Sequence, residues 1–219
     1  MSVDQVLASL IDHTLLRPDA SAGEVDKLCD EARAFGFRTV CVQPVLVARA
    51  ARALARSAVG VTAVVGFPHG ANMTDTKVFE ARRALDDGAT EIDMVANLGW
   101  IREGADAAVT DEIARVVAIA ASVGATVKVI LETALFLDER KEAAARAAMA
   151  GGAAFVKTAT GYGPGGATVA DVLLLRRVVG DAVGVKASGG IKTRAQALAL
   201  VAAGANRIGA SGSAALVAI

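Results

Sequence analysis

Aromatic residues, cysteines and histidines are scarce in this sequence of 219 residues. Only 4% of the residues are aromatic although 54% are hydrophobic, so we expect a core built from Val, Ala, Leu and Ile. Cys29 and Cys41 show no metal-ligand spacing, and with no signal peptide ahead of them they favour a reduced, cytoplasmic protein. For His13 and His69 we expect structural roles. The lack of clustered ligands predicts a site without metal or cofactor.

Net charge and long apolar runs are lacking as well. Lys plus Arg and Asp plus Glu number 23 each, so the chain has no general attraction for nucleic acid or for an anionic membrane. An anionic ligand would therefore need a local site. The longest apolar stretch, residues 116–127, is broken by Ser122 and Gly124 and ends at Lys128, which is too short to span a membrane. We expect a soluble protein.

What the chain does contain is one alternation that repeats from end to end. An Ala-rich, charged helical stretch is followed by a glycine turn and then by a short β-branched run. The helices are predicted at residues 3–10, 22–34, 45–57, 74–87, 103–123, 138–150, 169–179, 193–203 and from 211 onward. The strands are predicted at residues 11–14, 38–42, 61–66, 91–95, 126–131, before Lys157, before Lys186 and at 207–209.

Glycines mark the places where the predicted helices stop before the strands, at positions 36, 60, 88, 124, 151–152 and 204. Strands that alternate with helices indicate a parallel sheet, because each crossover needs a helix. Eight such units in about 200–250 residues fit a closed (β/α)8 TIM barrel. We therefore predict a single α/β barrel domain over residues 1–219 with a short N-terminal helix. The alternative, an open doubly wound sheet, is disfavoured because no GxGxxG follows an early strand.

Two lysines end short apolar strands directly before glycine loops. Lys157 follows Ala153-Ala154-Phe155-Val156, and Lys186 follows Val183-Gly184-Val185. For one such lysine, a strand-end side chain that reaches solvent is the simplest interpretation. Two on neighbouring strands would each disfavour protonation of the other, and an apolar setting would lower the pKa of both. A lysine with a lowered pKa is a nucleophile at neutral pH.

Ionisable residues also lie within the two strands that precede the lysine strands. Asp93 and Lys128 sit in apolar runs, so that four consecutive strands each carry a charge, and Asp12 and Glu132 occupy comparable positions. Burying four charges is costly unless they face one another. The alternative is that each lies in solvent at a strand end. The excess of lysine suits an amine nucleophile with a carboxylate that shuttles protons, and it does not suit a metal site.

Glycine-rich segments follow the last two strands, where many barrels bind phosphate. They read Ser188-Gly189-Gly190-Ile191 and Gly209-Ala210-Ser211-Gly212-Ser213, the second of which is expected to open the last helix. Glycines let backbone N–H groups approach an anion, and a helix N-terminus favours negative charge. A third loop, with glycines at 161, 163 and 165–166, lies beside them. These glycines can also be ordinary turn residues. Together with the lysines they favour a phosphorylated small substrate.

At these residues the sequence resembles the deoxyribose-phosphate aldolases over nearly its whole length. The similar stretches are residues 11–16 (Ile-Asp-His-Thr-Leu-Leu), 64–72 (Val-Val-Gly-Phe-Pro-His-Gly-Ala-Asn), 91–95 (Glu-Ile-Asp-Met-Val), 128–133 (Lys-Val-Ile-Leu-Glu-Thr) and the two lysine motifs at 155–161 and 185–191. The resemblance implies a class I aldolase that reversibly cleaves 2-deoxy-D-ribose 5-phosphate into acetaldehyde and D-glyceraldehyde 3-phosphate. It also implies that Lys157 is the Schiff-base nucleophile, that Lys186 lowers its pKa, and that Asp93 relays protons through a bound water.

The resemblance extends to the substrate pocket. It implies that Asp12, Cys41 and Lys128 line the pocket, although a buried core thiol is an equal interpretation of Cys41. The loop with Thr160 and Gly161 would close over the acetaldehyde carbon. The phosphate would be bound at Gly189, Gly190, Gly209 and Ser211. The family commonly has two consecutive serines where this sequence has Ser211-Gly212-Ser213, so one hydroxyl of the phosphate site is shifted or lost.

Two other functions fit the same pattern. Another phosphosugar barrel enzyme, such as a transaldolase-like transferase or an isomerase, is the first, and a non-catalytic phosphosugar-binding barrel is the second. The intact lysine pair argues against the second. The expected partners are a phosphorylated sugar and acetaldehyde, with no nucleic acid and no membrane, and a homodimer is an assembly open to the chain.

Overall fold

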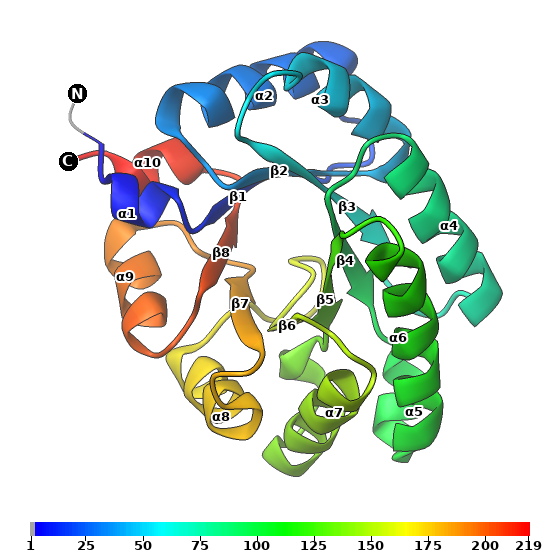
Figure 1. The fold of residues 1–219 in the computed structure, drawn as a ribbon. Helices are drawn as coiled ribbons and strands as arrows, with labels where there is room; N and C mark the ends of the chain where they lie inside the picture. The colour runs from blue at the N-terminus through cyan, green and yellow to red at the C-terminus, as the bar shows by residue number, and fades with distance from the viewer. Residues whose placement is uncertain (1–2) are drawn as a thin grey trace.

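Eight parallel strands close into a barrel in the computed structural model, which describes residues 3–219 (Figure 1). The strands are β1 Ile11–Leu15, β2 Thr39–Val42, β3 Gly60–Val65, β4 Glu91–Val95, β5 Thr126–Ile130, β6 Phe155–Lys157, β7 Gly184–Ser188 and β8 Arg207–Ala210. Each strand pairs with the next along the chain, and β8 pairs with β1. The prediction of a (β/α)8 barrel is therefore confirmed.

The helices form a ring outside the strands, as Figure 1 shows. They are α1 Gln5–Ala8, α2 Ala22–Phe35, η1 Pro44–Leu46, α3 Val47–Ala53, α4 Thr74–Asp86, α5 Leu98–Glu103, α6 Asp106–Ala121, η2 Thr133–Leu135, α7 Asp138–Ala150, α8 Val169–Val179, α9 Arg194–Ala202 and α10 Ser213–Val217. Within residues 3–219, no helix has the length and apolar character needed to cross a membrane.

Two of the predicted helices are wrong in extent, and backbone conformation explains both. The helix expected at 45–57 is η1 followed by α3, which ends at Ala53; Arg56 has a φ of +67°, which does not fit a right-handed helix. The helix expected at 103–123 is α6, which runs from Asp106 to Ala121, and the sequence missed α5, which ends just before it at Glu103. Gly104 ends α5 in a left-handed conformation with φ +76°, the usual conformation of a glycine at a helix C-terminus.

Both chain ends of the barrel also differ from prediction. Helix α1 is one turn long rather than eight residues, because Val3 forms a β-bridge with Ala218 instead of entering the helix. Helix α10 starts at Ser213, two residues later than expected. In Figure 1 helices α1 and α10 lie side by side. The first and last segments that the structure describes thus contact each other outside the barrel sheet, in addition to the pairing of β1 with β8.

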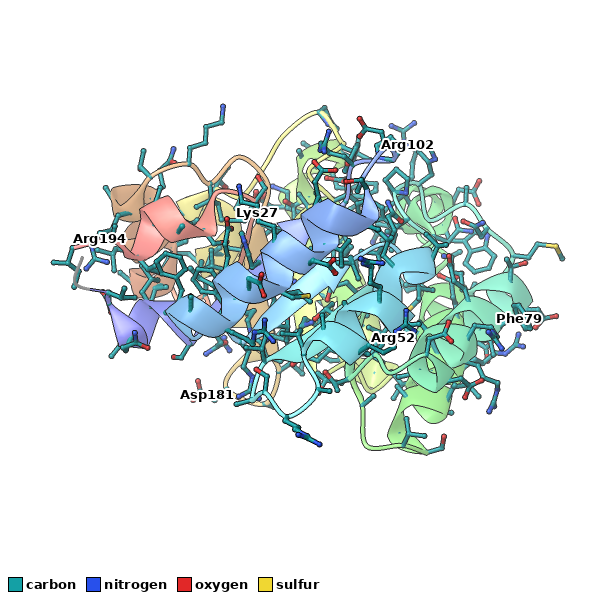
Figure 2. All side chains as sticks on the ribbon, turned by 90° about the horizontal axis from the view of Figure 1, so that it is seen from above. Lys27, Arg52, Phe79, Arg102, Asp181 and Arg194 are labelled. Atoms are coloured by element: carbon teal, nitrogen blue, oxygen red, sulfur yellow. The ribbon has the colours of Figure 1, made fainter. Side chains whose placement is uncertain are left out.

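Strand residues alternate between the helix-facing core and the barrel interior. Ile92, Val129 and Val156 belong to the main apolar core, whereas the intervening positions on the same strands carry the charged residues. Figure 2 turns the molecule by 90°, with Arg102 in α5 near one end of the barrel and Asp181, in the turn before β7, near the other. The loops that follow the strands gather at the Arg102 end. The functional side chains are expected at that end in a parallel barrel.

Candidate active site

Asp93 lies at the centre of a buried ionic network inside the barrel. Its Oδ2 accepts hydrogen bonds from Lys157 Nζ and Lys186 Nζ, both at 2.7 Å. Its Oδ1 accepts one from Lys128 Nζ at 2.8 Å. Strand register produces this convergence, since Asp93 is paired with Lys128 across β4 and β5, and Lys157 with Lys186 across β6 and β7. The four charges predicted on consecutive strands therefore do meet, and each satisfies another.

Asp12 on β1 forms a second carboxylate centre. It accepts from Lys186 Nζ at 2.5 Å and from Arg207 Nη1 at 2.7 Å, and the Thr39 hydroxyl donates to it at 2.8 Å. Asp12 and Lys186 are both fully buried. Lys186 is thus held between two carboxylates, Asp12 and Asp93.

Glu91 and Arg207 form a layer beneath the lysines. Glu91 lies two residues before Asp93 on β4, so the two side chains share the inner face of the barrel. Arg207 Nη1 donates to Glu91 Oε2 at 3.0 Å, and Lys128 Nζ lies 2.5 Å from the same oxygen. Neither Glu91 nor Arg207 stood out in the sequence. The period-two spacing from Asp93, and the strand-initial position of Arg207 beside the Lys186 strand, were the signals that could have found them.

The two lysines differ in charge state and in position: Lys157 ends β6 as predicted, whereas Lys186 lies inside β7, contrary to the prediction that it ends that strand. Burial lowers the pKa of Lys157, and the Lys186 ammonium lowers it further, against the opposing effect of Asp93. Burial also lowers the pKa of Lys186, but Asp12 and Asp93 outweigh it and raise that pKa overall. The prediction that both pKa values are lowered is therefore wrong for Lys186. The prediction of an apolar setting is also wrong, because Lys157 contacts a carboxylate rather than only hydrocarbon.

The carboxylates have the complementary shift. Burial alone would raise the pKa of Asp93, but Lys128, Lys157 and Lys186 hold it well below its usual range. Lys186 and Lys128 act in the same way on the pKa of Asp12. Both groups are therefore carboxylates at neutral pH, and each can accept protons only transiently.

A cavity of about 350 Å³ opens above this network. Lys157 lines it, together with Thr160, Gly161, Gly189, Gly190, Gly209 and Ser211, all of which were predicted site residues. The loops after β6, β7 and β8 thus meet in one place. Arg17 and Lys192 also line the cavity and were missed in the sequence, since surface cations in loops carry no distinguishing pattern.

The other predicted residues lie beneath the cavity rather than on its wall. Asp12, Asp93, Lys128 and Lys186 are each 0% exposed and belong to the ionic network described above. Cys41 is also fully buried, where it packs with Leu16 and Val64. Burial raises the pKa of the Cys41 thiol to about 11, so it remains neutral.

At two positions that line the cavity, the space around the backbone explains why the residue is glycine. A Cβ on Gly209 would lie 3.1 Å from Lys186 Cε, so Gly209 leaves room for the lysine stem. Gly189 has a φ of +91°, and a Cβ there would lie 3.0 Å from the backbone of Gly166 in the neighbouring loop. Gly189 after β7 and Gly209 within β8 are therefore more than ordinary turn residues.

The second serine of the β8 loop is turned away from the cavity. Ser213 is fully buried; its hydroxyl donates to Ala210 O at 2.9 Å and lies 3.0 Å from His13 Nδ1. His13 is held from its other side by Glu31, which gives it the structural role expected from the sequence. The helix that follows has only five residues and begins after Ser211, contrary to the expectation that Ser211 opens it.

Glu132 serves the loop after β6 rather than the lysines. It has a φ of +50°, unusual for a residue other than glycine, and its carboxylate Oε2 accepts from the Thr160 hydroxyl at 2.5 Å and from the Thr160 N–H at 3.2 Å. A Cβ on Gly163 would lie 2.7 Å from that carboxylate. The carboxylate therefore fixes the loop that begins directly after Lys157.

No group of three or more His, Cys, Asp or Glu side chains is arranged to hold a metal ion in the part of the chain that the structure describes. The interior of the barrel instead pairs each carboxylate with lysine or arginine. A cavity bordered by one buried amine and three glycine loops suits covalent chemistry on a small anionic carbonyl compound.

Comparisons with known proteins agree with this arrangement. Residues 6–219 match the model of the DeoC/LacD family aldolases. The chain is 52% identical over 207 residues to the deoxyribose-phosphate aldolase of Thermococcus gammatolerans, covering 94% of this chain and 92% of that protein. It is 51% identical over 207 residues to the protein of the same name from Thermosynechococcus vestitus, covering 94% of both.

Solved structures extend the likeness to the fold. A putative deoxyribose-phosphate aldolase from Coccidioides immitis superposes with a TM-score of 0.92 at 41% identity, covering 98% of this chain and 86% of that one. The deoxyribose phosphate aldolase of Aeropyrum pernix, described as a unique tetramer, also gives 0.92, at 37% identity, with 97% and 89% covered.

Proposed function

Because the chain belongs to the DeoC/LacD aldolase family, we propose that it cleaves 2-deoxy-D-ribose 5-phosphate reversibly into acetaldehyde and D-glyceraldehyde 3-phosphate as a class I aldolase. Lys157 is the amine that forms the imine. The observation that carries this assignment is its position: of the seven ionic side chains in the network, Lys157 alone lines the cavity. Burial and Lys186 also lower its pKa, which favours the nucleophilic form.

The reaction then follows from an amine at this position. Neutral Lys157 attacks the C1 aldehyde of the open-chain sugar, and loss of water from the carbinolamine gives an iminium ion. The C2–C3 bond breaks as its electron pair moves toward the iminium to form an enamine, while the C3 hydroxyl loses its proton and becomes the aldehyde of glyceraldehyde 3-phosphate. Protonation of the enamine at C2 and addition of water release acetaldehyde and restore the amine.

Asp93 is the group that we assign to proton transfer. It contacts Lys157 at 2.7 Å, within reach of the carbinolamine directly or through one water. Lys186 stays protonated between Asp12 and Asp93 and disfavours a second ammonium at Lys157. Lys128 holds the other Asp93 oxygen and thereby orients the carboxylate.

We assign the phosphate to the loops after β7 and β8, which form one wall of the cavity. Gly189, Gly190 and Ser211 line the same space as Lys157, and glycine lets backbone N–H groups approach an anion closely. Arg17 and Lys192 add two cations to this wall. In a protein with no net charge, such a local site is what an anionic substrate needs.

Trapping the imine tests the assignment. Incubation with acetaldehyde and borohydride should place one ethyl group on the peptide that contains Lys157, and activity should survive exhaustive chelation because the iminium acts as electron sink. An adduct on any other lysine would contradict the role of Lys157. Product analysis with and without an acceptor aldehyde separates this aldolase from a transaldolase-like transferase, which would move a dihydroxyacetone unit.

Two further expectations belong to the same proposal. A homodimer is one assembly open to the chain, and light scattering on the purified protein would measure the oligomeric state. We also keep the cytoplasm as the predicted location, consistent with two buried free cysteines, Cys29 and Cys41.

A further inference from the structure

The ionic network inside the barrel has an odd number of charges. It joins side chains of six strands through a continuous set of contacts. The cations are Lys128, Lys157, Lys186 and Arg207, and the carboxylates are Asp12, Glu91 and Asp93. Four cations against three carboxylates leave one positive charge in excess when all are ionised.

The excess charge falls on one particular lysine. Lys128 contacts three carboxylates, and Lys186 and Arg207 contact two each. Lys157 contacts Asp93 alone and shares it with two other lysines. An unbalanced charge is costly in a buried, low-dielectric site. The network is neutral when Lys157 has lost its proton and the other six groups are charged.

Glu91 and Arg207 contribute to this charge balance without contacting Lys157. Both lie in the lower layer of the network and neither lines the cavity, so substrate does not reach them there. Arg207 bridges Asp12 and Glu91, and its guanidinium lies 5.3 Å from the centre of the Phe155 ring. Arginine does not give up its proton in proteins, so the charge of Arg207 is fixed.

We propose that Arg207 and Glu91 are positioning residues that set the protonation of Lys157 through the charge balance of the network. This inference rests on the proposed role of Lys157 and goes beyond it, since it assigns a function to two residues that touch no substrate. Arg207 supplies the third permanent cation. Together with Lys128 and Lys186 it balances the three carboxylates, so that a proton on Lys157 would add an unbalanced charge. Glu91 supplies the third carboxylate that keeps the remaining six groups neutral as a set.

The other groups around Lys157 do not alter the count. The polar side chains of β2 and β3 are uncharged: they are the neutral thiol of Cys41 and the hydroxyls of Thr39 and Thr62, and Thr62 accepts from Lys128 at 3.3 Å. Glu132, after β5, is directed at Thr160. Arg17 and Lys192 line the solvent side of the cavity, where water screens them.

Two substitutions with opposite predicted signs test the inference. Arg207→Met keeps an apolar contact for Phe155 but removes a cation, so a protonated Lys157 completes the balance. The pH at which kcat/KM rises should move up by about one to two units, and ethyl trapping on Lys157 at neutral pH should fall about tenfold or more. Glu91→Gln removes a carboxylate and should move this acid limb of the kcat/KM profile, where kcat/KM rises with pH, to lower pH. The double variant has three cations, counting Lys157, and two carboxylates. This restores the excess of one positive charge, so the pH at which kcat/KM rises should return close to its original value.

Conservative variants separate charge from packing. Arg207→Lys and Glu91→Asp keep the charges, so their pH profiles should stay in place even where kcat falls. The inference is overturned if Arg207→Met and Glu91→Gln shift the limb in the same direction, or if neither shifts it while the adduct still maps to Lys157. If Arg207→Met does not fold, the sign of the Glu91→Gln shift decides. An adduct on another lysine in the unsubstituted protein overturns both this inference and the proposed function.

Discussion

Strands β6 and β7 each carry a lysine on the inner face of the barrel, and the two lysines are direct neighbours in register. Both follow buried valine residues, and both precede a loop containing glycines with positive φ. Their pKa values nevertheless move in opposite directions, downward for Lys157 and upward for Lys186. Since burial lowers both, the difference must come from the carboxylates that each one contacts.

Lys186 contacts two carboxylates, Asp12 on one side and Asp93 on the other, and shares each with other cations. Lys157 has only the shared oxygen of Asp93, and its other side borders the cavity. Burial lowers the pKa of Lys157, and because Lys157 has one carboxylate partner where Lys186 has two, less opposes that effect. The protonated neighbour costs little because two carboxylates neutralise it.

Replacing the cavity-facing lysine should have the largest effect. Lys157→Arg retains a cation beside Asp93 but cannot form an imine, so turnover should fall by roughly 10⁴- to 10⁶-fold, as when other covalent nucleophiles are removed. Borohydride trapping should disappear with it. Retention of both would show that the amine is elsewhere, and mapping the ethyl adduct in this variant would then locate it.

Replacing the other lysine should displace the pH profile instead of removing the nucleophile. Lys186→Leu takes away the ammonium that disfavours protonation of Lys157 and leaves Asp12 and Asp93 with fewer partners. Both changes raise the pKa of Lys157, so the acid limb of the kcat/KM profile should move to higher pH, with a loss of about 10²- to 10³-fold at neutral pH. Trapping on Lys157 should recover as the pH is raised.

Lys77 offers a matched control for that experiment. It is also a lysine with no exposed surface, but it lies outside the strands, paired with Glu112 at 2.9 Å and donating to Val95 O at 2.9 Å. Lys77→Leu should lower stability without moving the limb to higher pH. A limb displaced equally in both variants would mean that loss of any buried lysine, rather than the charge next to Lys157, produces the shift.

The fold was predictable because it rests on local signals repeated many times. The alternation of helices and β-branched runs located seven of the eight strands within two residues, whereas β7 ends at Ser188, three residues later than predicted. Helices 138–150 and 169–179 were predicted to the residue. Errors arose where a single residue broke the pattern. Arg56 adopts a positive φ within the stretch expected to be helical, and Gly104 adopts one between α5 and α6, so that α6 begins later than composition alone suggests.

The site was predictable in its members but not in its electrostatics. Period and strand ends placed Asp93, Lys128, Lys157 and Lys186 in one interior, and strand register brought them together. Which lysine meets which carboxylate depends on side-chain reach across the barrel, for which the sequence has no signal. The opposite pKa shifts of the two lysines could therefore not be read from two nearly identical motifs.

The same two lysines should also differ in what they contribute to stability. Lys186→Met leaves two buried carboxylates short of a partner and should lower the free energy of unfolding at pH 7 by about 3 to 5 kcal/mol. Lys157→Met should raise it. The folded pKa of Lys157 is lowered, so protonation of this lysine favours the unfolded state, and this cost disappears as the pH rises toward the unfolded pKa of about 10.4.

Urea unfolding from pH 7 to pH 10 measures both effects. The gain from Lys157→Met should shrink as the pH increases, while the raised pKa of Lys186 keeps its contribution present throughout this range. Equal losses in the two variants would show that the lysines have equivalent surroundings, contrary to their contacts.

The loops that follow the two lysines give the smallest and most selective effect. Gly190, after β7, has a φ of +72°, and a Cβ added there would meet no atom within 4 Å, so Gly190→Ala should fold with a backbone strain of about 1–2 kcal/mol. Its methyl group would enter the wall assigned to phosphate and raise KM for 2-deoxyribose 5-phosphate about tenfold, with little change for unphosphorylated deoxyribose. Gly124→Ala is the control, since Gly124 has the same φ and equal space but lies far from the cavity.

Gly161→Ala, in the loop after Lys157, should instead impair both sugars alike. If Gly190→Ala also impairs both alike, the phosphate is bound elsewhere, and the division of labour between the two loops is wrong.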